Sequence, residues 1–96
     1  MYTVVRSYSG QGAPELFDQL EQRNDDVKDL IGGVPGFVSY TAFRSAEGGL
    51  TGTVCQDKTG ADESSRRAAE WVKENLSATA NPPVISEGGT VVHFSS

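Results

Sequence analysis

The order of strand-like and helix-like segments is the feature that most constrains the fold of this chain. Four segments are rich in β-branched and aromatic residues, as β-strands are. Two further segments repeat apolar residues at helical spacing. The strand segments are residues 2–9, 37–44, 50–56 and about 90–94, and the helical segments are about 14–31 and 61–76. In chain order they alternate as strand, helix, strand, strand, helix, strand.

The first helical segment has clear start and stop signals. Pro14 suits a first helical turn, where its missing N–H has no intrahelical partner, and Glu15 favours the positive end of the helix dipole. Gly32, Gly33 and Pro35 end the segment. Its apolar stripe is Phe17, Leu20, Val27 and Ile31, interrupted by Asn24, and the second helix carries a stripe of Ala61, Ala68, Ala69, Val72 and Leu76.

This order predicts an α+β fold, the ferredoxin-like β-α-β-β-α-β arrangement. Four strands form one antiparallel sheet, and two helices cover one face of it. Residues 1–96 are expected to make a single ferredoxin-like domain, because 96 residues leave no room for a second. Pro82 and Pro83 exclude a helix before the last strand, and we expect a short extended piece at Val84 and Ile85 there.

The charge and the cysteine content exclude several classes of function. Eight Lys and Arg against 13 Asp and Glu give a net charge of −5, so neither nucleic acid nor an anionic membrane is expected as a partner. No apolar run approaches the length of a membrane span, and the N-terminus lacks the apolar segment of a signal peptide. Cys55 is the single cysteine, which excludes an internal disulfide. We therefore expect a cytoplasmic protein.

Apolar residues occur on both faces of the expected sheet. Val4 and Val5 lie on opposite faces of the first strand, and Val91 lies opposite Val92 and Phe94 in the last. A solvated sheet face normally carries polar residues, and large exposed apolar patches are rare on monomers. We therefore expect a homodimer through the sheet faces. The alternative is a monomer whose Ser and Thr side chains keep that face hydrated.

Three segments carry a resemblance to a known family. They are Val34-Pro35-Gly36-Phe37, Ala68-Ala69-Glu70-Trp71-Val72, and Pro83 to Gly89. Together with the topology, they make the whole chain resemble the dimeric α/β-barrel superfamily, and most closely small antibiotic-biosynthesis-monooxygenase-type proteins. The resemblance implies two ferredoxin-like subunits packed sheet against sheet, with ligand cavities between each sheet and its helices.

The same resemblance implies a small apolar or aromatic ligand and no metal or flavin cofactor. It does not imply haem degradation. Haem-degrading members use an Asn on the first strand and a His on the second helix, and this sequence has neither residue in those segments.

Four residues are candidates for lining a ligand pocket: Tyr40, Arg44, Trp71 and His93. Tyr40 and Arg44 share a strand face, where they can donate to a carbonyl and stabilise an anion. Alternatively, Tyr40 lies at a dimer interface and Arg44 in solvent. Trp71 either walls an apolar pocket or belongs to the core. His93, the only histidine, either accepts a proton or is a solvated strand residue. No set of carboxylates is placed around it for a metal site.

Further patterns refine this hypothesis. Arg6 and Tyr8 repeat the parity of Tyr40 and Arg44, which favours one polar cluster, and Cys55 is expected to be a small buried hydrophobe. Because the second helix presents small alanines to the sheet, we expect any cavity to lie between that helix and the sheet, with Trp71 on its wall.

No phosphate-binding, nucleophile-elbow or zinc-binding motif identifies an activity. Two hypotheses follow. One is a cofactor-independent monooxygenase-like enzyme that acts on a small aromatic or enolisable organic substrate. The alternative is a non-catalytic small-molecule-binding or assembly protein of the same fold.

Overall fold

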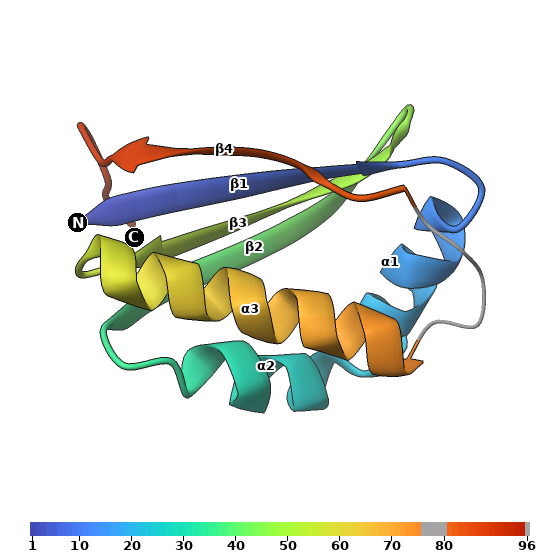
Figure 1. Cartoon of the computed structure of the whole chain (residues 1–96), viewed down its shortest axis with the longest axis horizontal. Helices are drawn as coiled ribbons and strands as arrows, with labels where there is room; N and C mark the ends of the chain where they lie inside the picture. Colours follow the sequence, from blue (N-terminus) through green and yellow to red (C-terminus); the bar gives the residue numbers. More distant parts are fainter. Residues whose placement is uncertain (76–80, 96) are drawn as a thin grey trace.

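The structure is a computed structural model that describes residues 1–75 and 81–95. It confirms the α+β fold: three helices pack on a four-stranded antiparallel sheet (Figure 1). The elements are β1 (Tyr2–Ser9), α1 (Ala13–Gln22), α2 (Asn24–Gly32), β2 (Phe37–Ser45), β3 (Gly48–Cys55), α3 (Lys58–Asn75) and β4 (Val84–Gly89). Among the described residues, no helix is long and apolar enough to cross a membrane.

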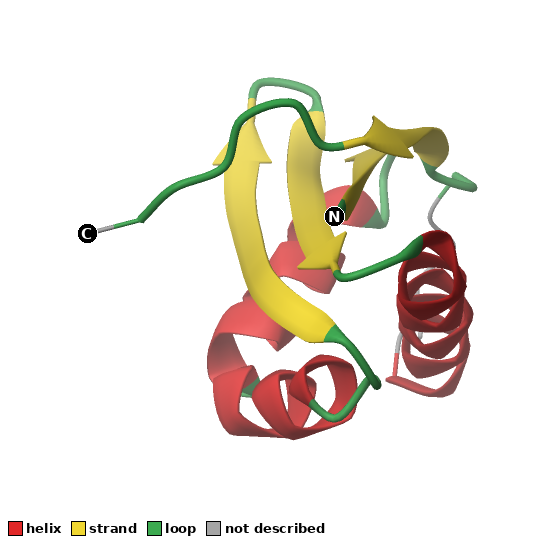
Figure 2. Cartoon of the chain, turned by 90° about the vertical axis from the view of Figure 1, so that its left-hand side faces the viewer, coloured by secondary structure: helices red, strands yellow, loops and turns green. Residues whose placement is uncertain are grey.

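The sheet has the strand order β2-β3-β1-β4, and every pair is antiparallel. The helices lie together on one side of it (Figure 2). The burial of β1 follows this arrangement, because Val4, Arg6 and Tyr8 are buried beneath the helices while Val5 and Ser7 are half-buried on the open face. Strand register carries the same division across the sheet, so Tyr40 and Thr53, which pair directly, share the helix-covered face.

The first predicted helix is in fact two helices, which corrects the expected count from two to three. α1 ends at Gln22, and Arg23 takes a non-helical conformation (φ −109°, ψ 34°) between α1 and α2. The cause lies in the next residues: Asn24 has low helix propensity, and Asp25 and Asp26 are more favourable in a first turn than within a helix. The apolar stripe still faces the core, since Phe17, Val27 and Ile31 are buried and Leu20 is partly buried.

The last strand was predicted at the wrong place. β4 spans Val84–Gly89, so the extended piece expected at Val84 and Ile85 is the start of the strand, whereas residues 91–94 are not in a strand. The reason is the length of β1. β1 begins at Tyr2, which pairs with Gly89, and the Thr90 N–H donates to the Met1 carbonyl, so the pairing of the two strands ends there.

The remaining bounds differ by a few residues from those predicted. α3 begins at Lys58 instead of about residue 61, and β3 begins at Gly48. Leu76, the expected end of the second helix, lies outside the described residues.

The core lies between the helices and the sheet. Buried Tyr8, Leu16, Phe17, Val27, Ile31 and Trp71 form one apolar cluster. Tyr8 and Phe17 meet edge to face, with ring centroids 6.1 Å apart. Gly49 makes this packing possible, because a Cβ there would lie 2.3 Å from the Phe17 ring. This contact places α1 against the centre of the sheet.

The opposite face of the sheet carries exposed apolar groups. Phe43, Leu50, Ser7 and Val84 form one row across all four strands, and Phe43 is 53% exposed. The C-terminal segment leaves β4 and projects away from the helices (Figure 2). Within it, Val91 is 94% and Phe94 87% exposed. The single chain does not show a dimer, so the homodimer stays a prediction.

Candidate functional site

A groove of about 830 Å³ lies between the α1–α2 pair and β2. Its walls are mainly apolar and include both aromatic and aliphatic side chains, with a few polar groups from α1, α2 and β2. The apolar members are Phe17, Leu20, Val27, Ile31, Phe37, Tyr40, Ala42 and Phe43, and the polar ones are Glu21, Asn24, Lys28, Ser39 and Arg44. A mostly apolar cleft of this size with a few polar groups is typical of a small-molecule site.

A second, interior pocket of about 20 Å³ lies between α3 and the sheet. Ala68, Trp71 and Val72 from α3 line it together with Thr51 of β3. It shares Tyr40 with the groove, as well as Leu20, Val27 and Ile31. Its volume is that of about one water-sized group. The space beneath the small alanines of α3 is therefore nearly filled, and the larger opening lies beside β2.

The four predicted pocket residues are only partly brought together. Tyr40 lines both the groove and the interior pocket, Arg44 lines the groove, and Trp71 lines the interior pocket. Trp71 is 9% exposed and belongs to the core cluster. His93 lies in the exposed C-terminal segment and lines neither pocket.

Tyr40 is the polar group at the junction of the two pockets. Burial raises the pKa of Tyr40 to about 12, and the neighbouring Tyr8 adds to the rise, although the Arg6 charge and a hydrogen bond with Thr51 act in the opposite direction. The pKa of Tyr8 is also raised, mainly by burial. At neutral pH both phenols are therefore protonated. Tyr40 can donate a hydrogen bond to a ligand oxygen, but it cannot act as a general base there.

The Arg44 guanidinium forms ion pairs with two carboxylates. Its Nη2 lies 2.9 Å from Asp18 Oδ1 and 3.0 Å from Glu21 Oε1 on α1. The hydrogen bonds that Arg44 donates to Glu21 and Asp18 raise its pKa, with Glu21 as the larger cause. The side chain thus links β2 to α1 at the exposed rim of the groove, and two acidic groups already balance its charge.

Strand parity grouped Arg6 with Tyr8, Tyr40 and Arg44 in one polar cluster. Arg6 was not among the four residues predicted to line a pocket. It is 1% exposed, and it donates five hydrogen bonds to four hydroxyls. These belong to Thr51, Thr53, Ser64 and Ser65. Within residues 1–75 and 81–95, no carboxylate forms a hydrogen bond or ion pair with its guanidinium. Burial lowers the pKa of Arg6.

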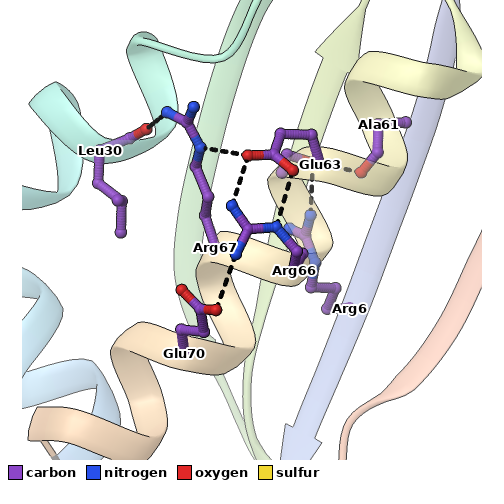
Figure 3. A network of polar contacts seen from close by, with 8 residues as sticks. Arg6, Leu30, Ala61, Glu63, Arg66, Arg67 and Glu70 are labelled. Atoms are coloured by element: carbon purple, nitrogen blue, oxygen red, sulfur yellow. Dashed lines mark hydrogen bonds and ion pairs between the residues drawn. The ribbon is translucent and has the colours of Figure 1, made fainter.

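A network of ion pairs on α3 holds that helix against α2 (Figure 3). Glu63 binds Arg66 at 2.7 Å and Arg67 at 2.8 Å, and Arg66 also binds Glu70 at 2.7 Å. Arg67 Nη1 donates to the Leu30 carbonyl of α2, at 2.8 Å. The pairs of Glu63 with Arg67 and of Arg66 with Glu70 both have the i,i+4 spacing that places side chains side by side on a helix. The network fixes the position of the helices that enclose both pockets.

Two further predictions concern reactive or metal-binding groups. Cys55 is fully buried, and burial raises the pKa of its thiol, which suits a core residue and not an activated nucleophile. Over the described ranges, no group of three or more His, Cys, Asp or Glu side chains could hold a metal ion.

Comparisons with known proteins establish the fold. No protein-family model and no curated protein sequence matches the chain. Solved structures do match over nearly its whole length. One is the monooxygenase ActVA-Orf6 of Streptomyces coelicolor in complex with nanaomycin D, which shares 19% identity, covers 99% of this chain and 91% of its own, and has a TM-score of 0.69.

Two further solved structures match over a similar share of this chain. The haem degrader MhuD of Mycobacterium tuberculosis shares 13% identity over 99% of this chain and 100% of its own, with a TM-score of 0.69. The cofactor-independent oxygenase SnoaB of Streptomyces nogalater shares 16% identity, covers 98% of this chain and 94% of its own, and has a TM-score of 0.56. The chain therefore has the same ferredoxin-like fold as these proteins, as the sequence predicted.

Proposed function

We propose that this protein is a cofactor-independent, monooxygenase-like enzyme that binds a small aromatic or enolisable organic substrate in the groove between α1–α2 and β2. The observation that carries the proposal is the groove itself, about 830 Å³ in volume and walled mainly by apolar and aromatic side chains. Such a site buries a flat ring by apolar contact and orients it through few polar groups. Structures of the same fold include oxygenases, and one of them is in complex with the ligand nanaomycin D.

Tyr40 has the leading polar role in this proposal. Tyr40 lines both pockets, and its hydroxyl stays protonated at neutral pH. It donates a hydrogen bond to the carbonyl or phenolic oxygen of the substrate, which favours the electron-rich enol or phenolate form that reacts with oxygen. Trp71 and the apolar groups around it exclude water from the inner end of the site.

Oxygen uptake tests the catalytic proposal. The purified protein is incubated with a hydroxynaphthalene and with an anthrone, and oxygen consumption is measured against a protein-free control and against Tyr40→Phe. We expect uptake above autoxidation that a metal chelator does not abolish, and a reduction of about tenfold or more in Tyr40→Phe. Uptake no faster than autoxidation would contradict the catalytic part of the proposal.

One observation favours the non-catalytic alternative. Tyr8 and Tyr40 line the pockets, and the pKa values of both phenols are raised above 10. A general base requires a pKa near the working pH, so neither phenol suits that role. A small-molecule-binding protein does not need such a base. Quenching of the single tryptophan by the same aromatic compounds, without oxygen uptake, would support this alternative.

We also propose that the protein is a homodimer joined through the open sheet faces. The exposed row that includes Phe43 and Val84 supports it, as does the apolar C-terminal segment with Val91, Val92 and Phe94. These groups are exposed to solvent in a single chain, and a second copy would cover them. Light scattering over a concentration series tests this, and a monomeric mass at all micromolar concentrations would contradict it.

A further inference from the structure

The charge of Arg6 is unusual for a buried side chain. Buried guanidinium groups are normally paired with a carboxylate, because taking a charge out of water is costly. Arg6 is 1% exposed, and its hydrogen-bond partners among the described residues are the neutral hydroxyls of Thr51, Thr53, Ser64 and Ser65, at 2.8 to 3.3 Å. These hydroxyls fix the direction of the guanidinium, which points from β1 toward α3 (Figure 3), without neutralising its charge.

The hydroxyl of Thr51 connects this charge to the pockets. Thr51 Oγ1 accepts a hydrogen bond from Arg6 Nη1 at 3.3 Å, and the same residue lines the interior pocket with Tyr8 and Tyr40. That oxygen accepts from Arg6, so its single proton can be donated to a neighbouring oxygen, and hydrogen bonding with Thr51 acts to lower the pKa values of Tyr8 and Tyr40. The positive charge therefore lies one hydroxyl behind the wall of the site.

Other charged groups near the groove do not supply the same field. Arg44 is paired with Asp18 and Glu21 at the rim, so its charge is balanced and exposed to solvent. Lys28 lies on the exposed side of α2 at the groove. An exposed charge is screened by water and salt, whereas a buried one is screened much less. Glu87 acts on Arg6 only as a minor electrostatic influence.

We propose that Arg6 is the specificity-determining residue of the site and that it selects a ligand carrying an anionic oxygen, such as a phenolate, an enolate or an aromatic carboxylate. The anionic oxygen occupies the water-sized interior pocket at Thr51 and Tyr40, and the ring lies in the groove. The ligand then supplies the negative charge that the protein does not place beside Arg6. This inference rests on the proposed small-molecule site, but it does not require that the bound molecule be oxidised.

A pair of probes of similar shape tests the selection. 4-Nitrophenol ionises near neutral pH and 4-nitroanisole does not, so binding of the two compounds separates charge from ring contact. Binding is followed by quenching of Trp71, the only tryptophan, and ionisation of bound 4-nitrophenol by its visible absorbance. We expect the wild type to bind the phenolate at least about tenfold more tightly than the ether, and to lower the pKa of the bound phenol.

Variants identify the charge responsible. Arg6→Met keeps an unbranched stem and removes the charge, and it is expected to bind both probes equally and to leave the phenol pKa unchanged. Thr51→Val, which keeps the shape of the side chain and breaks the link to the pocket, is expected to lose most of the preference with Arg6 still present. Arg66→Met is the matched control, since Arg66 lies on the outer face of α3, paired with Glu63 and Glu70.

The outcomes separate the two proposals. Equal binding of both probes by the wild type, or a preference that survives in Arg6→Met and disappears in Lys28→Met, would overturn the role of Arg6 while leaving the site intact. Binding of neither probe would overturn the small-molecule site and the selection together. Thermal unfolding accompanies each variant, and if Arg6→Met fails to fold, Thr51→Val and Lys28→Met still decide between the two charges.

Discussion

At the scale of single residues, the Tyr40 hydroxyl shows how burial sets chemistry in the candidate site. Burial favours the neutral phenol, so the pKa of Tyr40 rises from 10.0 to about 12 in the folded chain. The unfolded chain releases this proton at lower pH than the native one. The contribution of Tyr40 to stability is therefore complete below pH 10 and is lost as the pH rises from 10 toward 12.

We predict that Tyr40→Phe flattens this alkaline loss. The free energy of unfolding of the wild type should fall by about 2 kcal/mol more than that of Tyr40→Phe between pH 10 and pH 12. Urea unfolding at a series of pH values measures the difference. Identical pH profiles for wild type and Tyr40→Phe would contradict the burial of this group.

The sequence could predict some residues of the site but not their partners. Strand parity correctly grouped Arg6 and Tyr8 on β1 with Tyr40 on β2, because side chains alternate with a period of two. Parity could not show that Arg44 meets Asp18 and Glu21, since those contacts depend on where α1 packs. Nor could it show that Arg6 is enclosed by hydroxyls of β3 and α3, which are 45 to 59 residues away in sequence.

At the scale of elements, α3 is attached by an apolar inner face and a charged outer face. Val72 packs against the core and lines the interior pocket. We predict that Val72→Asp lowers the free energy of unfolding by about 2–3 kcal/mol, because a carboxylate there is placed among apolar groups. Lys73→Asp, one residue away on the exposed face, is the matched control for helix propensity. Equal melting temperatures for the two variants would mean that the helix is turned differently.

The ion-pair network of α3 gives a prediction in acid. Hydrogen bonds from Arg66 and Arg67 lower the pKa of Glu63 from 4.5 to about 2. A lowered carboxylate pKa contributes stability that is present above pH 4.5 and is lost as the pH falls toward 2. Glu63→Gln should therefore be less stable than the wild type at pH 7 by a small amount and should lose less stability on acidification. Melting temperatures between pH 7 and pH 2 measure this, and parallel profiles would contradict it.

Two elements show where local sequence patterns are insufficient. The stripe of Phe17, Leu20, Val27 and Ile31 fits one long helix, yet the chain breaks at Arg23, whose side chain bonds to Asn75 at the end of α3. Residues 91–94 have higher strand propensity than Gly88 and Gly89. The glycines nevertheless pair with β1 while residues 91–94 do not, because register with the partner strand decides.

At the scale of the whole molecule, the topology was predictable because six periodic segments leave few ways to build a layered domain of 96 residues. The groove was not predictable to the same degree. Its volume depends on how far the α1–α2 pair stands from β2, and that distance follows from the break at Arg23 and the contact of Phe17 with Tyr8. The small alanines of α3 suggested an opening beneath that helix, but the opening there holds only about 20 Å³.

The open sheet face supplies the last prediction. Phe43 and Val84 lie in one row on the face that the helices leave uncovered, and the C-terminal segment projects from the same side with Val91, Val92 and Phe94 exposed. If a second copy covers these groups, a charge in the row places an unpaired ion in the interface, and removal of the segment removes apolar area from it.

We therefore expect Phe43→Lys, and a chain ending at Thr90, each to shift a dimer toward monomer by at least about tenfold in dissociation constant, which corresponds to about 1.4 kcal/mol. Sedimentation equilibrium measures the constant. Glu47→Lys is the control, because Glu47 is also exposed but lies in the turn between β2 and β3. Each variant should keep the native helical circular dichroism, since none of these residues belongs to the core cluster. A dimer of unchanged affinity in both variants would place the subunit contact on another surface.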